Sequence, residues 1–377
     1  MVLGSVSNGK LRFVSFIVVA IVCLSVITVS LYRQEESSDP VKVGVVLPLT
    51  GPASFLVDIR DGMLLAVDEV NEDGGIGGRP LELIVRDSES SPEAGLAAFE
   101  RIEARHKPVM YLSATSSVSN AIAPRAEEIG VPLMGLVVSM TGFTEGREWV
   151  FRFFPQASDE ADVILGIMGT LEPENVCIAH IDDPYGLSIT KAVRDDLVSD
   201  GVNVTEIPFE PDRTDFSDLL VDSGDYDVLV PVGYAGHVRG FCDHIHRTGY
   251  DGAVITTSSA STPDFWGDEA MDGVYLSAPN LYHPSNVFVK DVQEMFERAY
   301  GRDFTHYAAY GYDAIHILAG LMDKGDVSRE DALEALDSAF VYTGTLGSVM
   351  KAHGEKEISV PLYPAVIEDG ELVRFRK

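Results

Sequence analysis

Residues 41–52 read VKVGVVLPLTGP, and residues 62–78 read GMLLAVDEVNEDGGIGG. The first stretch is a β-branched run that ends in the turn signal Thr50-Gly51-Pro52, which is typical of a strand and its following loop. In the second stretch, apolar side chains recur at positions 63, 66, 67 and 70, which is the spacing of one helical face. The two stretches therefore predict a strand followed by a helix, which the glycines then end.

The same alternation continues along the chain and then restarts near residue 175. Each series has the βαβ order, which implies a parallel sheet covered by helices on both faces. We therefore predict an α/β fold of two doubly wound (Rossmann-like) lobes. The predicted strands are residues 81–85, 109–112, 131–138, 175–181, 202–207, 226–232 and 253–257, and the predicted helices are residues 93–105, 121–129, 187–199, 237–248 and 308–324.

Small hydroxyl side chains and tyrosines follow several predicted strands. The loops read SATSSVSN at residues 113–120, SMTG at 139–142, DDPYG at 182–186, GYAG at 233–236 and SSAS at 258–261. In open α/β sheets, ligands bind beyond the carboxyl ends of the strands, where helix N-termini expose backbone N–H groups. These loops therefore predict a site for a small polar molecule.

These stretches resemble the periplasmic binding proteins of branched-chain amino acids and amides, the type 1 receptors of ABC importers with a leucine/isoleucine/valine-binding fold. The resemblance is carried by PLTG in residues 41–52, by the spaced G-x-x-x-A and N-x-x-G-G-I-x-G of residues 62–78, and by Gly-Tyr-Asp-Ala at residues 311–314, expected at a helix start. It extends from about Val41 to near the C-terminus.

The resemblance implies two lobes that are joined by three strand crossovers and close like a hinge on a ligand. The crossovers are expected near residues 154–159, 277–281 and 343–348. The first lobe would then comprise residues 41–156 and 280–345, and the second residues 157–279 and 346–377.

The resemblance also implies which residues contact the ligand. The Ser116, Ser117 and Ser139 hydroxyls and the backbone at Val137 are expected to hold a carboxylate, Tyr185 and Tyr234 to form the second-lobe wall, and Phe55 to shape the side-chain pocket. The serines and tyrosines have ordinary alternatives, because serines cap helices and tyrosines often only pack.

Ser258 falls where the resembling family has an acidic residue that receives the ligand's ammonium group. A buried ammonium without a counter-charge costs several kcal/mol, and a serine does not supply that charge. We therefore expect neutral amides or simple carboxylates to bind better than zwitterionic amino acids, unless Asp264 or Asp182 replaces the missing acid.

Motifs for catalysis or metal binding do not emerge. In the stretch from Cys242 to His246, His244 and His246 are two residues apart on a predicted helix and point to different faces, so they cannot share a metal ion. The glycines of residues 74–78 lack the Gly-Lys-Ser/Thr of a phosphate loop. We expect no catalytic residue, metal or cofactor.

The expected function is capture of an amino acid, amide or small carboxylate outside the cell and its delivery to the permease and ATPase subunits of an ABC importer. The alternative is a ligand-sensing extracellular receptor that acts through a separate signalling partner. An enzyme is not expected, since no triad, metal set or phosphate loop accompanies the fold.

The N-terminus predicts attachment to a membrane. Lys10 and Arg12 precede an apolar run over residues 13–32, which is long enough to cross a bilayer as a helix, and residues 34–40 form a polar linker. The positive flank places the rest of the chain outside the cytoplasm. Whether this segment is cleaved as a signal peptide stays open.

The formal net charge is −31, from 59 acidic and 28 basic residues. Such a charge excludes nucleic acid as a partner, since phosphate binding requires clustered lysine and arginine. It is consistent either with a high-salt habitat, where screening relieves self-repulsion, or with a strongly acidic soluble surface. Of the three cysteines, Cys177 and Cys242 are expected to be buried free thiols.

The charge gives a direct prediction. If the acidic surface is an adaptation to salt, the melting temperature should rise as potassium chloride increases from about 0.1 M to above about 1 M, because screening weakens repulsion among carboxylates. Thermal denaturation across this series measures the effect. A melting temperature that stays level or falls would reject the adaptation.

Overall fold

The computed structural model describes residues 39–219, 225–283, 285–287, 289–322 and 327–376. The predicted membrane segment at residues 13–32 lies outside these ranges. Within them, no helix combines the length and the apolar character that crossing a bilayer requires. Cys177 and Cys242 are buried free thiols, as expected.

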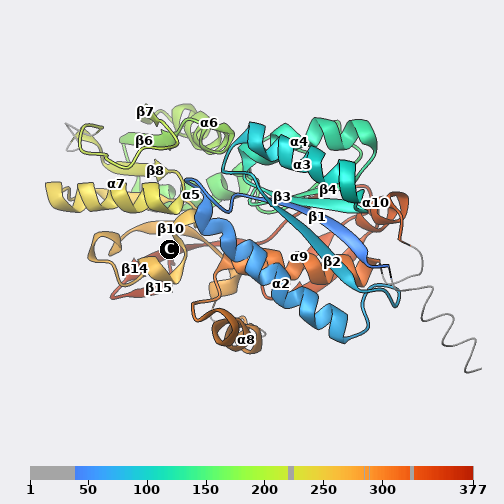
Figure 1. Cartoon of the computed structure of the whole chain (residues 1–377). Helices are drawn as coiled ribbons and strands as arrows, with labels where there is room; N and C mark the ends of the chain where they lie inside the picture. The colour runs from blue at the N-terminus through green and yellow to red at the C-terminus, as the bar shows by residue number, and fades with distance from the viewer. Residues whose placement is uncertain (1–38, 220–224, 284, 288, 323–326, 377) are drawn as a thin grey trace, which may run out of the picture.

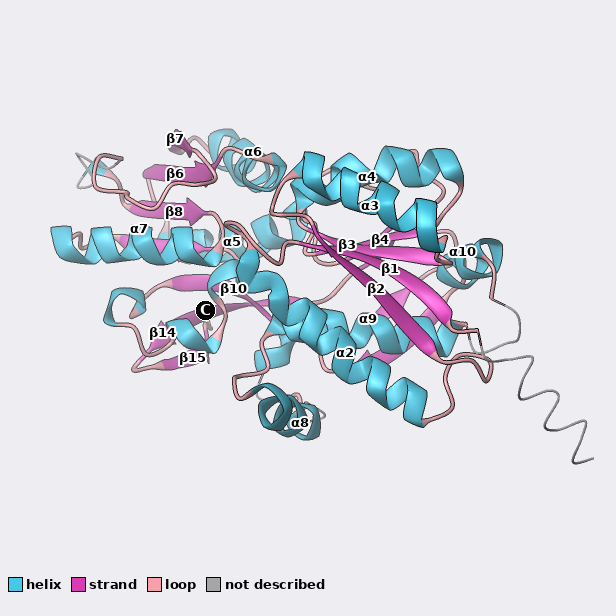
Figure 2. Cartoon of the chain, in the orientation of Figure 1, coloured by secondary structure: helices cyan, strands magenta, loops and turns pink. Residues whose placement is uncertain are grey.

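Two α/β lobes lie side by side, and each is built on a mainly parallel sheet (Figures 1 and 2). In the first lobe the sheet order is β13-β5-β4-β3-β1-β2, with every pairing parallel. The expected fold class is confirmed. The strands of this sheet are β1 Val41–Leu47, β2 Leu81–Asp87, β3 Met110–Ala114, β4 Leu133–Leu136, β5 Val150–Phe153 and β13 Glu357–Ile358.

Helices cover both faces of the first sheet because its strands alternate apolar side chains between two cores. Val43 and Val45 pack with α2 and α9 on one face, whereas Val46 and Ile84 pack with α3 and α4 on the other. Helices α8 and α10 belong to the same core as α2 and α9. The helices are α2 Val57–Glu72, α3 Pro92–His106, α4 Ser116–Ile129, α8 Lys290–Tyr300, α9 His306–Leu321 and α10 Arg329–Asp337.

The second lobe has the sheet order β15-β14-β10-β9-β8-β6-β7, in which β14 and β15 are antiparallel additions at one edge. Helices α5 and α6 pack on one face of this sheet and α7 on the other. Its elements are α5 Ala157–Leu171, β6 Asn175–Ile181, α6 Pro184–Ser199, β7 Asn203–Phe209, β8 Val228–Val232, α7 Ala235–Thr248, β9 Ala253–Thr256, β10 Tyr275–Pro279, β14 Leu362–Glu368 and β15 Glu371–Arg374.

The chain passes between the lobes at residues 154–156, just after β10, and at residues 359–361. The last of these was expected at residues 343–348, and that expectation is wrong. Those residues belong to a hairpin of β11 (Phe340–Gly344) and β12 (Gly347–Lys351). The chain then pairs β13 with β5 of the first sheet before it crosses. The predicted lobe boundary at 345/346 therefore falls inside a hairpin.

Asp313 explains why this hairpin stays with the first lobe. Its buried carboxylate accepts the backbone N–H groups of Thr345 (3.0 Å) and Leu346 (2.9 Å) and the Tyr342 hydroxyl (3.1 Å). Helix α9 begins at His306 and has Thr305 as its cap. The Gly-Tyr-Asp-Ala motif at residues 311–314 therefore lies inside α9, and not at a helix start as the resemblance implied.

Helices α2 and α9 cross in close contact through two glycines. A Cβ atom on Gly62 would lie 2.0 Å from the Ala308 carbonyl oxygen, and one on Gly311 would lie 2.1 Å from the Ile59 carbonyl oxygen. Any side chain at either position would therefore push the helices apart. The glycines of the two separate motifs are thus needed for one contact.

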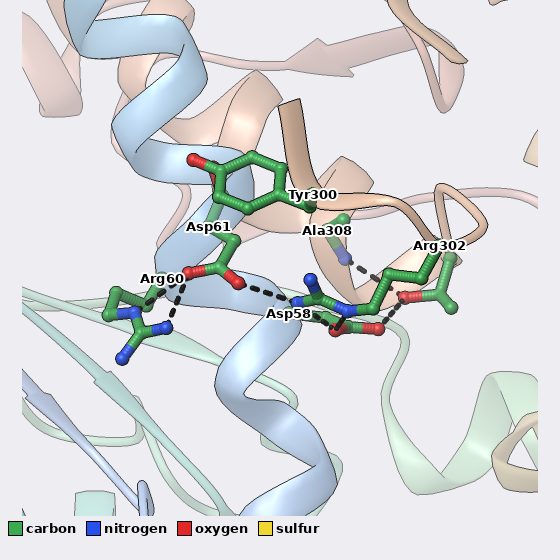
Figure 3. Close-up of polar contacts among 7 residues, drawn as sticks. Asp58, Arg60, Asp61, Tyr300, Arg302 and Ala308 are labelled. Atoms are coloured by element: carbon green, nitrogen blue, oxygen red, sulfur yellow. Dashed lines mark hydrogen bonds and ion pairs between the residues drawn. The ribbon is translucent and has the colours of Figure 1, made fainter. Parts of the chain in front are cut away.

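Polar side chains also join α2 to the segment that leads into α9 (Figure 3). The Arg302 guanidinium donates to Asp58 at 2.7 and 3.0 Å and to Asp61 at 2.6 Å, and Thr305 donates to Asp58 at 2.7 Å. Arg60 pairs with the other side of Asp61. These bonds fix the start of α9, and with it Tyr307 in its first turn, against α2.

Candidate functional site

A cavity lies between the lobes, where the carboxyl ends of both sheets meet. Residues from both lobes line it, and aromatic and hydroxyl side chains predominate. The lining residues are Phe55, Leu56, Thr115, Ser116, Val137, Ser139, Phe154, Glu160, Tyr185, Tyr234, Ser258, Ser259 and Tyr307.

The first lobe contributes the ends of β3 and β4. Thr115 and Ser116 follow β3 at the N-terminus of α4, and the Ser116 hydroxyl accepts the Met140 N–H at 3.4 Å. Thr115 has a φ of 69° and Val137 a φ of 52°, which are conformations that β-branched residues rarely adopt. Each costs about 1–3 kcal/mol, and such strain gathers at functional sites. Both strained residues line the cavity.

Phe55 reaches the cavity from the loop after β1. Asp87, at the end of β2, holds this loop by accepting the Leu49 N–H (2.9 Å) and the Thr50 hydroxyl (2.7 Å). The Phe55 ring lies 5.3 Å from that of Tyr307 and 6.1 Å from that of Tyr234, measured between centroids. The PLTG loop therefore places an aromatic ring in contact with both lobes.

Tyr185 and Tyr234 form the second-lobe wall. Their rings are stacked, with 6.3 Å between centroids and 5° between planes. The Tyr234 hydroxyl donates to Asp183 (2.9 Å), and the Tyr185 hydroxyl bonds the Thr257 hydroxyl at 2.7 Å. Burial, followed by the Asp183 charge, raises the pKa of Tyr234, so the phenol stays a neutral hydrogen-bond donor.

Glu160, on the first turn of α5, is the one acidic residue among those described as lining the cavity. It is 1% exposed and accepts hydrogen bonds from the Ser258 N–H (3.2 Å), the Ser258 hydroxyl and the Ser277 hydroxyl. Burial raises its pKa, and the bonds from Ser258 and Ser277 oppose that shift. None of the described lining residues is a lysine or arginine, so the carboxylate has no cation in the cavity.

Glu160 changes the interpretation of Ser258. Ser258 does line the cavity, but the premise that the cavity lacks an acid is wrong, because Ser258 holds a carboxylate from another element in place. Asp182 and Asp264, proposed as replacements, are not among the described lining residues. The expected preference for neutral ligands therefore loses its physical reason.

The structure brings nearly all of the predicted contact residues together. Phe55, Ser116, Val137, Ser139, Tyr185, Tyr234 and Ser258 all line the cavity. Ser117 is not among them, and its side chain instead lies beside the Tyr234 hydroxyl.

Sequence reasoning missed Glu160, together with Leu56, Thr115, Phe154, Ser259 and Tyr307. A signal for Glu160 was present in the sequence. It occupies the same helical face as the buried Ala157, Ala161 and Ile164, and a charge on an apolar face marks either a paired or a functional group.

A cavity between two α/β lobes is the site expected of a binding protein, and this chain is similar to known binding proteins. The family model described as "Periplasmic binding protein" matches residues 40–371. This chain belongs to that family. The sequence resemblance to the periplasmic binding proteins is thereby confirmed, and the family consists of binding proteins rather than enzymes. The family's description as periplasmic indicates a location outside the cytoplasm.

Proteins that this chain is similar to have several named roles. The chain is 24% identical over 336 residues to the chemotactic signal transduction system substrate-binding protein BasB of Halobacterium salinarum, covering 84% of this chain and 79% of that protein. The branched-chain amino acid transporter substrate-binding protein LivJ of Streptococcus pneumoniae, solved with isoleucine, has a TM-score of 0.79 at 21% identity, covering 89% of this chain and 98% of that one. An ABC transporter solute-binding protein of Rhodopseudomonas palustris, solved with 3,4-dihydroxybenzoic acid, has a TM-score of 0.80 at 20% identity, covering 90% and 96%.

Proposed function

We propose that this protein is the solute-binding component of an ABC importer and that it traps a small polar ligand in the interlobe cavity by hinge closure. The observation that supports this most is the cavity itself, since the strained loops of one lobe face the tyrosine wall of the other. Two solved structures of this fold are named as transport proteins, which favours delivery to permease and ATPase subunits over sensing.

The proposed ligand carries both charges. Ser116 and Ser139 lie at the N-terminus of α4 and at the end of β4, where hydroxyls, N–H groups and the helix dipole favour a carboxylate. Glu160 lies on the opposite lobe and favours an ammonium group, because a cation would neutralise a buried charge. Aromatic rings between them suit an apolar side chain. We therefore propose a zwitterionic amino acid.

The apolar segment at residues 13–32 is proposed to hold the protein at the outer face of the cell membrane. A sensing role would need a separate signalling protein, such as the chemotactic signal transduction system for which the Halobacterium relative is named. Permease and ATPase genes beside the gene for this chain would separate the two roles.

Binding is tested by thermal denaturation against amino acids, their amides and matched carboxylates. A ligand that binds only the native state and is present at 100 times its Kd should stabilise the protein by about 2.7 kcal/mol. The expected result is an upward shift of the melting temperature with one or a few apolar amino acids. If no compound of the panel shifts it, the transport proposal fails.

A further inference from the structure

A buried arginine lies directly behind residues 137–140 of the first lobe, the loop that lines the cavity and is here called the ligand loop. Arg152 is on β5 and is 1% exposed. Its Nη1 donates to the carbonyl oxygens of Val138 (3.2 Å) and Met140 (2.9 Å). These two carbonyls flank Ser139, which lines the cavity, as does the strained Val137 that precedes them.

Three further backbone groups in and beside this loop are also bonded. The Ser139 carbonyl accepts the Ala157 N–H at 2.8 Å, the Met140 N–H donates to Ser116, and the Thr141 N–H donates to Ser188 of the second lobe at 3.2 Å. Without the guanidinium, the Val138 and Met140 carbonyls would lose the donor that the structure gives them, and Val138 is buried. Arg152 is therefore the group that holds the backbone where Val137 is strained.

A carboxylate from a remote segment holds Arg152 in turn. Glu357, on β13, approaches the guanidinium at 2.8 Å and accepts the Thr144 hydroxyl. Arg152 and Glu357 are also opposite each other where β5 pairs with β13. Strand β13 ends just before residues 359–361, the last connection to the second lobe.

We propose that Arg152 is a positioning residue that sets the ligand loop at residues 137–140, and that its pairing with Glu357 couples this loop to the last interlobe connection. The importance of the loop for ligand binding rests on the function proposed above. The geometry of the loop does not rest on that function. The position of the loop and its role in binding are therefore tested separately.

Hydrogen–deuterium exchange of the full-length protein without ligand tests the positioning. In Arg152→Met, the amides of residues 138–141 should exchange about tenfold faster or more, while those of β1 and β3 stay within about twofold of the wild type. Glu357→Gln should give a smaller effect at the same amides. Arg125→Met is the matched control, because Arg125 pairs with the half-exposed Glu100 of the same lobe at 2.8 Å, away from the loop.

Arg152→Lys serves where Arg152→Met does not fold. Lysine keeps the charge for Glu357, but its single ammonium cannot span Glu357 and both carbonyls. Loop exchange should therefore still rise. Exchange that rises equally in the loop and in β1 and β3, or that does not change in the loop, would overturn the proposal. Titration of the variants with isoleucine then tests the link to binding, and its failure would count against the proposed function alone.

Discussion

A Glu160→Gln variant is expected to lose most of its affinity for amino acids while it stays folded. The amide has the same size and can still bond Ser258 and Ser277, but it cannot neutralise an ammonium group. Leaving one charge of a buried pair unpaired costs about 2–5 kcal/mol, so the Kd for an amino acid such as isoleucine should rise about thirtyfold or more.

Isothermal titration with the amino acid and its des-amino analogue isolates this effect. The analogue should bind Glu160→Gln at least as well as it binds the wild type, because it has no ammonium group to pair. Glu174→Gln is the matched control, since Glu174 is exposed in the same lobe. If Glu160→Gln binds both compounds as the wild type does, Glu160 is not the counter-charge.

The raised pKa of Glu160 adds a pH dependence with two signs. An ammonium ligand needs the ionised carboxylate, so its affinity should fall as the pH is lowered through the pKa of Glu160. In the protein without ligand, the folded state holds the Glu160 proton more tightly than the unfolded chain does. The stability that this contributes is fully present below the pKa that Glu160 has in the unfolded chain, and it is lost as the pH rises through the pKa that Glu160 has in the folded protein. Glu160→Gln should remove both dependences, as denaturation and titration across the pH range would measure.

A Gly311→Ala variant is expected to unfold far more easily than the wild type. The added Cβ would lie 2.1 Å from the Ile59 carbonyl oxygen, and a backbone atom cannot rotate away as a side chain can. Helices α2 and α9 must separate, which lowers the free energy of unfolding by about 3 kcal/mol, the upper end for overpacking. Urea denaturation measures the loss.

The same helix supplies the control. Gly320 is exposed near the end of α9 and has no atom within 4 Å of an added Cβ. Gly320→Ala should therefore stabilise the protein by about 0.5–1 kcal/mol, because alanine loses less backbone entropy than glycine in a helix. Equal unfolding free energies for the two variants would show that the α2–α9 crossing does not require a glycine.

The sequence by itself determined the alternation of strands and helices over residues 41–138 and 175–257, the two-lobe α/β fold and the family, but it missed β5, β10, the strands after residue 340 and helices α5, α8 and α10. The features that it determined follow from short-range patterns: period-two and period-3.6 apolar spacing, and turn residues between them. The sequence also determined most of the cavity lining, including Ser116, Ser139, Tyr185 and Tyr234. Parallel strands bring their carboxyl ends to one edge, so the loops that follow them lie together whatever their separation in sequence.

Tertiary structure alone decided which charge enters the cavity and where the chain last crosses between the lobes. Glu160 reaches the cavity beside Ser258 and Ser277, which are 98 and 117 residues away. Asp313 and Arg152 likewise hold the segments at 345–346 and 357 from far earlier in the chain. Local pattern says that a buried charge must have a partner, but only packing of remote elements selects that partner.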